Sequence, residues 1–452
     1  MRATLPHPSG KDTMDKKGGC SRREFLKTAP CALAGAAAFP TIVSASVLGR
    51  GAVPPSDRIV MAGIGFGMQG PPNMRSFLGK GEVQWVAVCD IDESHLKQAQ
   101  GIVNSRYGTQ DCATYKDYRE LFARGDLDAV SLAVPDQWHA ILSISAVRAG
   151  LDVYGEKPFT HSLREGRALC DAVKRYGRVW QTGSWQRSTE NFYRAAELVR
   201  CGRIGKVRRV EVGLPSGYTD FAKTFGQEKI TDPPPGFDYE TWLGPAPWAP
   251  YCTARVHMNW RWNMDYGGGQ LMDWVGHHLD IAHWALGLDL TGPVEVSGTG
   301  EFPTKGIYNG ATRYWVETRY ADGTPMVLAG GYAEIPSGTK WIGDDGWVWV
   351  DRNGFETQPA GLVNEVIGPN EAKLVHSRDH YQNFLDAVRT RGQTLAPAEV
   401  GHRSASVGHL GVIAIETGRT IKWDPATETI IGDPAAERLL SRSYRKPYQL
   451  PA

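Results

Sequence analysis

The sequence has no excess of charge of either sign, and beyond its N-terminal region it has no long apolar run. Lys and Arg together number 50 and Asp and Glu 49 among 452 residues, which gives a net charge of +1. This balance excludes the basic surface of a nucleic-acid-binding protein. The lack of a later apolar segment of about 20 residues excludes a stable membrane anchor. Without repeats or low-complexity tracts, the chain is expected to form two or three globular domains.

Cysteine is also scarce. Two of the seven cysteines fall in the N-terminal region, and the other five are widely spaced with no C-x-x-C pair. An odd, scattered set predicts neither a disulfide framework nor a zinc site. The pattern suits a protein that folds in the cytoplasm, even if it is exported afterwards.

The N-terminal region has the features of an export signal. The segment Ser21–Lys27 reads SRREFLK and precedes a run of small apolar residues over 32–47. Arg22 and Arg23, followed by a hydrophobic pair and an apolar run, match the twin-arginine signal. We therefore expect 1–56 to be a signal and linker, the twin-arginine export machinery to be a partner, and the protein to be periplasmic or otherwise exported. A basic arm on a cytoplasmic protein is the alternative.

A glycine motif follows this linker. The residues after Ser56 read RIVMAGIGFGMQG, in which a short apolar strand over 59–64 leads into Gly65, Gly67 and Gly70. In a G-x-G-x-x-G motif the first glycine permits a tight turn, and the second lets the backbone approach a pyrophosphate. The third allows a helix to pack closely on the strand. The motif predicts a dinucleotide-binding site.

A second strand ends at Asp90, twenty residues after Gly70. A carboxylate at this place can accept hydrogen bonds from the ribose hydroxyls of a dinucleotide, and it would repel a 2′-phosphate. NAD is therefore favoured over NADP as the cofactor. A glycine turn with an incidental aspartate is the alternative.

The alternation of strands and helices continues to about residue 187 and predicts a Rossmann domain over 57–187, with a parallel, doubly wound sheet. Ligands bind at the carboxyl ends of such strands. Lys157 lies at one of these ends, where its ammonium can stabilise a developing alkoxide, although a surface loop lysine fits the same position. His139 lies just inside a helix start and can be a packing group or a ligand contact.

After residue 187 the sequence pattern changes and predicts few helices and several strands. Hairpin turns are expected at Asp322-Gly323 and over 344–346. We expect an α+β domain over 188–425 with a largely antiparallel sheet, one face of which covers the mouth of the first domain, and a C-terminal tail over 426–452.

The stretch over 267–280 reads GGGQLMDWVGHHLD and combines glycines with ionisable groups. As a regular helix it would place Asp273, His277 and Asp280 on one face, with His278 about 100° away. Four interpretations stay open at this point: a catalytic site, a metal site, a sugar-binding helix without chemistry, and a structural helix.

Several motifs together resemble those of the glucose–fructose oxidoreductase, inositol dehydrogenase and rhizopine-catabolism (Gfo/Idh/MocA) family, in its exported branch. They are GFGMQG, VPDQWH, GEKPFTHSLREGR, WLGPAPW, GGGQLMDWVGHHLDIAHWALG, HYQNFLDAVRTRG and AEVGHRSASVGHLG. The resemblance covers nearly all of the chain after the signal. It implies a Rossmann domain, an open-faced sheet domain, a nicotinamide cofactor, a carbohydrate or polyol substrate, and a homo-oligomer, either dimer or tetramer.

The resemblance also implies roles for particular residues. His277 would be the general base on a substrate hydroxyl, Asp273 would orient the substrate or the imidazole, and Lys157 would polarise the oxygen. Some members use a tyrosine as the base, so Tyr266 is an alternative. The predicted cofactor-binding residues are Gly65, Gly67, Gly70, Asp90, Pro135, His139, Glu156 and Lys157. The predicted substrate-binding residues are Trp185, Arg261, Tyr266 and His278. No metal is expected.

The sequence thus predicts an exported NAD(P)-dependent oxidoreductase of a sugar, polyol or glycoside. An exported enzyme has little access to cytoplasmic NADH, so we expect it to retain its cofactor. Redox-neutral, NAD-dependent glycoside cleavage and sugar binding without turnover are the alternatives. An aromatic-rich loop is expected to form a lid over the sugar or else part of the sheet-domain core, and its tryptophans are Trp242, Trp248, Trp260 and Trp262.

Overall fold

A computed structural model describes residues 53–221 and 223–451 of the chain. The predicted twin-arginine signal and most of the linker lie outside these residues. Among the helices of the described part, none combines the length and the apolar character needed to cross a membrane.

The first sheet has six parallel strands, as the fold prediction requires. In spatial order the strands are β3 (Ala113–Tyr115), β2 (Val83–Cys89), β1 (Ile59–Ile64), β4 (Ala129–Leu132), β5 (Asp152–Gly155) and β6 (Trp180–Thr182). The strand order reverses between β1 and β4. Ligands of such sheets bind at the carboxyl ends of the strands beside this reversal.

Helices connect these strands and keep the sheet parallel. They are α2 (Gly70–Leu78), α3 (Glu93–Tyr107), α4 (Tyr118–Phe122), α5 (Asp136–Arg148) and α6 (Leu163–Tyr176). Asp92 begins α3 by accepting hydrogen bonds from the N–H groups of Ser94 and His95, while Gly108 and Gly177 end α3 and α6 with positive φ angles. The helix bounds thus follow capping residues that are visible in the sequence.

The second sheet has nine strands and confirms the predicted fold class. In spatial order they are β13 (Phe355–Gln358), β12 (Trp347–Val350), β11 (Gly338–Gly343), β7 (Val207–Leu214), β10 (Pro325–Gly330), β9 (Arg313–Arg319), β8 (Glu295–Glu301), β14 (Ile421–Asp424) and β15 (Thr429–Ile430). All neighbours are antiparallel except β7 and β10. The hairpins β9–β10 and β11–β12 turn where the Asp-Gly signals predict.

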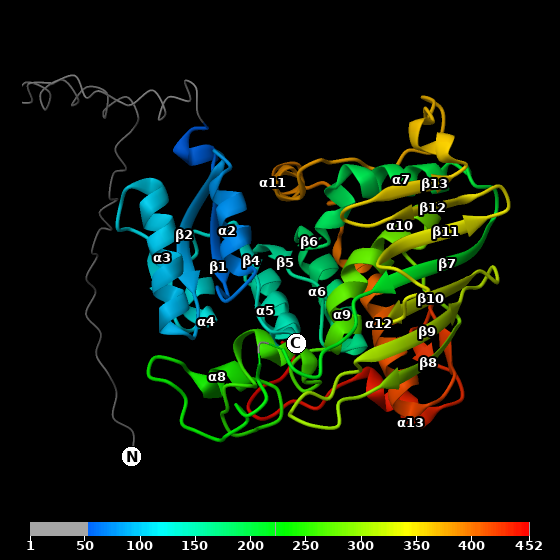
Figure 1. The fold of residues 1–452 in the computed structure, drawn as a ribbon. Helices are drawn as coiled ribbons and strands as arrows, with labels where there is room; N and C mark the ends of the chain where they lie inside the picture. Colours follow the sequence, from blue (N-terminus) through cyan, green and yellow to red (C-terminus); the bar gives the residue numbers. More distant parts are fainter. Residues whose placement is uncertain (1–52, 222, 452) are drawn as a thin grey trace, which may run out of the picture. The chain divides into compact units, whose positions relative to one another are not determined.

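Helices lie between the two sheets, which differs from the expectation that a sheet face covers the mouth of the first domain (Figure 1). These helices are α7 (Glu190–Arg200), α9 (Gly269–Trp274), α10 (Asp280–Leu286) and α12 (Ala398–Thr417). Their apolar side chains share one core with the nine-stranded sheet, which includes Leu410 and Leu271 of the helices and Val316 and Val212 of the sheet. The sheet buries its inner face against helices because that face is apolar.

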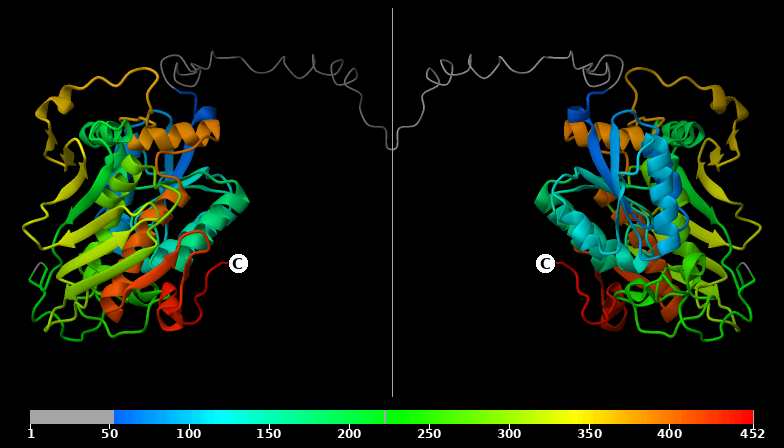
Figure 2. Two further views of the ribbon diagram at one scale, coloured as in Figure 1. Left: turned by 90° about the vertical axis from the view of Figure 1, so that its right-hand side faces the viewer. Right: turned by 90° about the vertical axis from the view of Figure 1, so that its left-hand side faces the viewer.

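The C-terminal part of the chain returns to the first domain. Phe384 and Leu385 of α11 (His380–Thr390) belong to the same buried cluster as Phe77 and Trp85 of the Rossmann domain. The chain ends near α5, where the Tyr448 ring meets Trp138 edge-on at 5.3 Å between centroids (Figure 2). Residues assigned by sequence to the second domain and to a tail therefore complete the first domain.

The stretch over 267–280 is not one regular helix. A π-helical turn, η5 (Val275–Leu279), separates α9 from α10. The expectation that Asp273, His277 and Asp280 share a face is wrong for this reason, since a wider turn breaks the α-helical period.

The short elements of the described chain are η2 (Pro55–Asp57), η3 (Trp185–Ser188), α8 (Tyr239–Leu243), η4 (His257–Trp262), η6 (Ala360–Asn364), α13 (Pro434–Glu437) and η7 (Arg438–Leu440).

Candidate active site

The glycine loop after β1 has the close packing that a pyrophosphate-binding turn needs. Gly65 has a φ of +86°, and a Cβ atom there would lie 2.4 Å from the carbonyl oxygen of Ala133. A Cβ atom on Gly70 would lie 1.9 Å from the carbonyl oxygen of Gly65, so this residue brings the start of α2 against the loop. A Cβ on Gly67 would meet only the His95 ring, at 3.6 Å. The loop therefore fits a dinucleotide whose pyrophosphate lies over Gly67 at the N-terminus of α2.

Asp90 stands at the end of β2 and is held in place by backbone groups. Its Oδ2 accepts the N–H of Phe66 at 2.7 Å, and its Oδ1 accepts the N–H of Asp92 at 2.9 Å. These bonds tie the strand end to the glycine loop and fix the carboxylate where ribose hydroxyls of NAD would lie.

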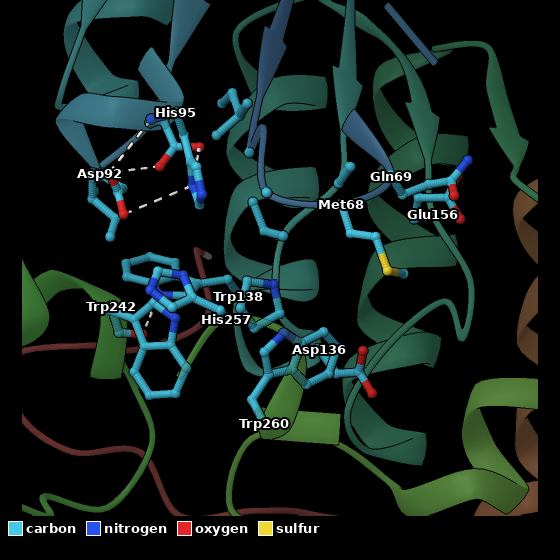
Figure 3. A pocket seen from close by; sticks show the side chains of 18 of the residues that line it. Met68, Gln69, Asp92, His95, Asp136, Trp138, Glu156, Trp242, His257 and Trp260 are labelled. Carbon is cyan, nitrogen blue, oxygen red and sulfur yellow. Dashed lines mark hydrogen bonds and ion pairs between the residues drawn. The ribbon is translucent and has the colours of Figure 1, made fainter. Parts of the chain in front are cut away.

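One cavity brings most of the predicted cofactor-binding residues together (Figure 3). Those that line it are Gly65, Gly67, Asp90, Pro135, Glu156 and Lys157. Gly70 lies behind the loop. His139 is buried outside the lining, where its Nε2 lies 2.9 Å from the carbonyl oxygen of Val134 and its Nδ1 lies 3.2 Å from that of Phe159. It links the chain segments that follow β4 and β5.

The second domain supplies another wall of this cavity. The residues it contributes are Phe237, Thr241, Trp242, His257, Met258, Trp260, Arg261 and Asp273. Figure 3 shows Trp242, His257 and Trp260 on the side of the cavity that faces Met68 of the glycine loop. Of the predicted lid tryptophans, Trp242 and Trp260 face the cavity, whereas Trp248 is exposed and Trp262 is buried with its N–H donated to Gln270. The cavity is thus enclosed by both domains.

Asp92, His95 and His257 form a group at the Asp90 end of the cavity. A carboxylate oxygen of Asp92 and one imidazole nitrogen of each histidine all lie within 4.8 Å of one another. The two imidazole rings meet edge-on, with their centroids 5.5 Å apart. His257 has a φ of +56°, a conformation that non-glycine residues adopt rarely and mostly where surrounding contacts require it. Because all three residues line the dinucleotide cavity, we treat them as part of the cofactor-binding surface.

At the other end of the cavity, Lys157 makes an ion pair with Asp273. Its Nζ donates to Asp273 Oδ1 at 2.7 Å and to the Asp273 carbonyl oxygen at 3.0 Å. Lys157 follows β5 of the first domain and Asp273 lies in α9 of the second, so the pair joins the two predicted halves of the site. Both side chains keep some exposure, 17% and 22%.

The π-helical turn places His277 close to this ion pair. Gly276 packs directly on Lys157, because a Cβ atom there would lie 2.8 Å from Lys157 Cβ. The His277 ring meets Trp185 and Trp274 edge-on, with centroids 6.1 and 5.4 Å away. Burial, followed by the charge of Lys157, lowers the pKa of His277 well below its ordinary value, so the imidazole is neutral at pH 7 and can accept a proton.

Three cations act on the single carboxylate of Asp273. Besides Lys157, the Nε of Arg261 lies 3.7 Å from Asp273 Oδ1, and Arg352 contributes a further attraction. Burial opposes ionisation, but these charges together bring the pKa of Asp273 below its ordinary value. Asp273 is therefore an anion, able to accept hydrogen bonds from a hydroxyl.

Near the Lys157–Asp273 ion pair, two ionisable residues were not among the predicted site residues. Asp136, the first residue of α5, is buried and lines the cavity. Burial and then the charge of Asp273 raise its pKa to about 8, so this carboxyl is protonated at pH 7. Its position after β4 could have indicated a ligand contact, but an acidic residue in a first helical turn also stabilises the helix alone. Arg352 lies in the turn after β12, and no sequence motif marks it.

Outside the lining of the cavity lie His277, three of the predicted substrate-binding residues (Trp185, Tyr266 and His278) and Asp280. Tyr266 is buried and its hydroxyl accepts a hydrogen bond from Arg255 at 3.3 Å. His278 Nδ1 lies 2.9 Å from the carbonyl oxygen of Gly213 in β7. Asp280 binds Arg187 through both oxygens, at 2.6 and 2.9 Å. The geometry therefore separates Asp280 from Asp273 and His277, so it does not build the metal site considered for this cluster.

Fold and site together define the class: a two-domain protein whose Rossmann domain binds a dinucleotide. Residues 58–184 match the family model for the NAD-binding Rossmann fold of the Gfo/Idh/MocA oxidoreductases, and residues 191–450 match the model for their C-terminal alpha/beta domain. The chain belongs to this family, and NAD is its cofactor.

Among curated proteins, a glycosyl hydrolase family 109 protein of Shewanella pealeana is 30% identical over 171 residues, which cover 34% of this chain and 37% of that protein. The scyllo-inositol 2-dehydrogenase (NAD(+)) of Bacillus subtilis is 27% identical over 185 residues, 41% of this chain and 42% of that protein. In both cases the match spans less than half of the relative's length.

Solved structures show the same fold. The aldose-aldose oxidoreductase of Caulobacter crescentus, complexed with glycerol, aligns with a TM-score of 0.60 and 19% identity over 81% of this chain and 99% of that one. The WlbA dehydrogenase of Bordetella pertussis, in complex with NADH and UDP-GlcNAcA, aligns with a TM-score of 0.59 and 17% identity over 81% and 99%.

Proposed function

We propose that the protein is an exported NAD-dependent oxidoreductase that acts on a hydroxyl or carbonyl group of a sugar, polyol or glycoside and retains its cofactor. The observation that carries this proposal is the ion pair of Lys157 with Asp273, both of which line one end of the NAD cavity, with a neutral His277 buried just behind it.

The three side chains divide the work of alcohol oxidation. A bound NAD supplies the hydride acceptor, so the chain must remove the hydroxyl proton. Neutral His277 takes that proton, and the Lys157 ammonium lowers the energy of the alkoxide oxygen. Asp273 orients Lys157 and accepts a hydrogen bond from a second hydroxyl of the substrate. In the reduction direction the same groups return the proton.

A test compares His277→Asn and Lys157→Met with the parent enzyme in the oxidation of a panel of sugars and polyols. Both variants should lose about 100-fold or more in kcat, because each removes a group that acts on the reacting oxygen. Trp248→Phe, on an exposed side chain outside the cavity, is the matched control. Parent-like rates in His277→Asn would remove this residue as the base.

Cofactor retention is supported by the wall that the second domain adds to the cavity. Release of the dinucleotide would require residues on η4 and α8 to move away from the glycine loop. Mass spectrometry of the denatured, purified protein should detect NAD at close to one per chain. Protein purified without any dinucleotide would contradict retention.

Export is supported by the SRREFLK segment. Replacing both Arg22 and Arg23 with lysine should keep the protein in the cytoplasm, since the paired arginines are what twin-arginine export recognises. Cell fractionation measures the outcome, and unchanged export would remove this part of the proposal. We also propose a homo-oligomer, either dimer or tetramer, formed through the outer face of the nine-stranded sheet, which no labelled helix covers in Figure 1. Sedimentation would measure the oligomeric state.

Redox-neutral glycoside cleavage is a second candidate, supported by Asp136 and by the glycosyl hydrolase family 109 relative. A carboxyl group that is protonated at pH 7 in the cavity can donate a proton to a departing glycosidic oxygen. Release of an aglycone from an aryl glycoside without net NADH formation, and its loss in Asp136→Asn, would favour cleavage over net oxidation.

A further inference from the structure

Arg352 is exposed in the turn after β12, outside the lining of the NAD cavity, and lies over two tryptophans. Its guanidinium carbon is 4.8 Å from the ring centre of Trp185 and 4.4 Å from that of Trp274. The same two rings hold His277 edge-on. Arg352 therefore stands beside the proposed base, on a platform of two half-buried aromatic rings.

Within the described part of the chain, Arg352 makes no ion pair. Its hydrogen-bond partner is a neutral amide, since Nη2 and Nε lie 3.3 and 3.4 Å from Gln186 Oε1. The charges of Asp273 and Asp351 act on it only from a distance. Asp351 Oδ1 is already bound by the N–H groups of Asn353 and Gly354.

Positive charges therefore outnumber negative charges around the site. Lys157, Arg261 and Arg352 share one ionised carboxylate, Asp273. Asp136 adds no negative charge at pH 7, because burial raises its pKa to about 8. Glu156 lies toward the cofactor, where Asn73 donates to it and burial raises its pKa.

We propose that Arg352 binds an anionic group of the substrate, and that the substrate is an acidic sugar carrying a carboxylate, such as a hexuronic acid or its glycoside. This inference rests on the proposed function, because it names the substrate class of the same site. The planar guanidinium matches a carboxylate with two parallel hydrogen bonds, and the flanking tryptophans suit the apolar face of a sugar ring. An arginine stacked on aromatic rings is also held in one orientation, so it loses little freedom on binding.

The test measures binding and turnover of matched sugar pairs by the NAD-loaded, full-length protein. Each pair consists of an acid and its uncharged amide, such as glucuronate with glucuronamide and galacturonate with galacturonamide. At least one acid should bind about 10- to 100-fold more tightly than its amide, as expected for a charge-assisted hydrogen bond. The preference should weaken as salt is raised.

Arg352→Gln should abolish the preference for the acid over the amide, while Arg352→Lys should restore part of it, because lysine keeps the charge but lacks the planar guanidinium. Arg208→Gln is the matched control, on an exposed arginine of β7 paired with Asp344. It should behave as the parent protein. Unfolding midpoints of all variants identify any that fail to fold.

Any of five outcomes would overturn the inference. Equal binding of acids and amides by the parent protein would show that the excess positive charge does not bind a substrate carboxylate. An acid preference that survives in Arg352→Gln would assign it to another group. Tight binding of a sugar phosphate or sugar sulfate, with none of a uronate, would replace the carboxylate with that group. Turnover of neutral sugars alone would contradict the inference but leave the proposed function intact, whereas no response of the bound NAD to any sugar would contradict both.

Discussion

Asp136 offers a quantitative test of the site's electrostatics, because its carboxyl is buried beside an ionised one. Folding raises its pKa from about 3.8 to about 8, through burial and then the charge of Asp273. A group whose pKa is raised on folding stabilises the protein fully below the unfolded pKa and loses that contribution as the pH rises through the folded pKa. The unfolded carboxyl ionises freely above about pH 4, so the native state becomes progressively less favoured between pH 4 and 8.

Asparagine cannot ionise and has nearly the same shape, so Asp136→Asn should remove this dependence. About three pH units separate the unfolded pKa from pH 7, at roughly 1.4 kcal/mol per unit, so the variant should be more stable than the parent by up to about 4 kcal/mol at pH 7. The difference should be small near pH 4 and constant above about pH 8. The amide oxygen can still accept the N–H of Gly268, as the carboxyl does.

Urea unfolding of the NAD-loaded proteins at several pH values measures this difference. Asp111→Asn, on an exposed aspartate, is the control for the substitution itself. A variant that is destabilised to the same extent at every pH would refute the reasoning, because it would mean that the carboxyl acts through shape and hydrogen bonding rather than through its ionisation.

Three other substitutions test separate parts of the structure. Lys157→Met should lower kcat by about 100- to 1000-fold in steady-state kinetics, since it removes the charge that stabilises the alkoxide, and a loss below about threefold would contradict that role. Gly70→Ala should deprive the purified protein of its NAD, because the new Cβ would lie 1.9 Å from the Gly65 carbonyl oxygen; an unchanged dinucleotide content would show that the loop can adapt. Asp280→Asn leaves the buried Arg187 without one of its carboxylate partners and should lower the free energy of unfolding by about 3–5 kcal/mol in urea titrations; a change under about 1 kcal/mol would argue against a structural role for this pair.

The cofactor half of the site could be predicted because its determinants lie close together in sequence. A strand, three glycines at fixed spacing and an acidic residue at the end of the next strand specify one local geometry. The structure has that geometry, with β1 leading into Gly65 and Asp90 accepting the N–H of Phe66. Both sheets were predictable for a similar reason, since hydrophobic periodicity and turn residues act over short distances.

The substrate half could be predicted only in part. Motifs predicted Lys157, Asp273 and His277, which the structure brings close together, but the π-helical turn that arranges the last two has no sequence signature of its own. Arg352 comes from a turn 75 residues beyond His277 and is brought beside the site by the pairing of β11 with β7 and β12. Contacts of this kind depend on the assembled sheet, so a local sequence pattern carries no information about them.

The most direct test of the account is to follow the near-ultraviolet absorbance of the cofactor that the purified protein carries while sugars and their acids are added. The account predicts that bound NAD is reduced by at least one of these compounds, and that His277→Asn and Lys157→Met, still loaded with NAD, are not reduced at a comparable rate. A protein whose bound NAD responds to no compound, or whose two variants respond as fast as the parent, would contradict the active site described here.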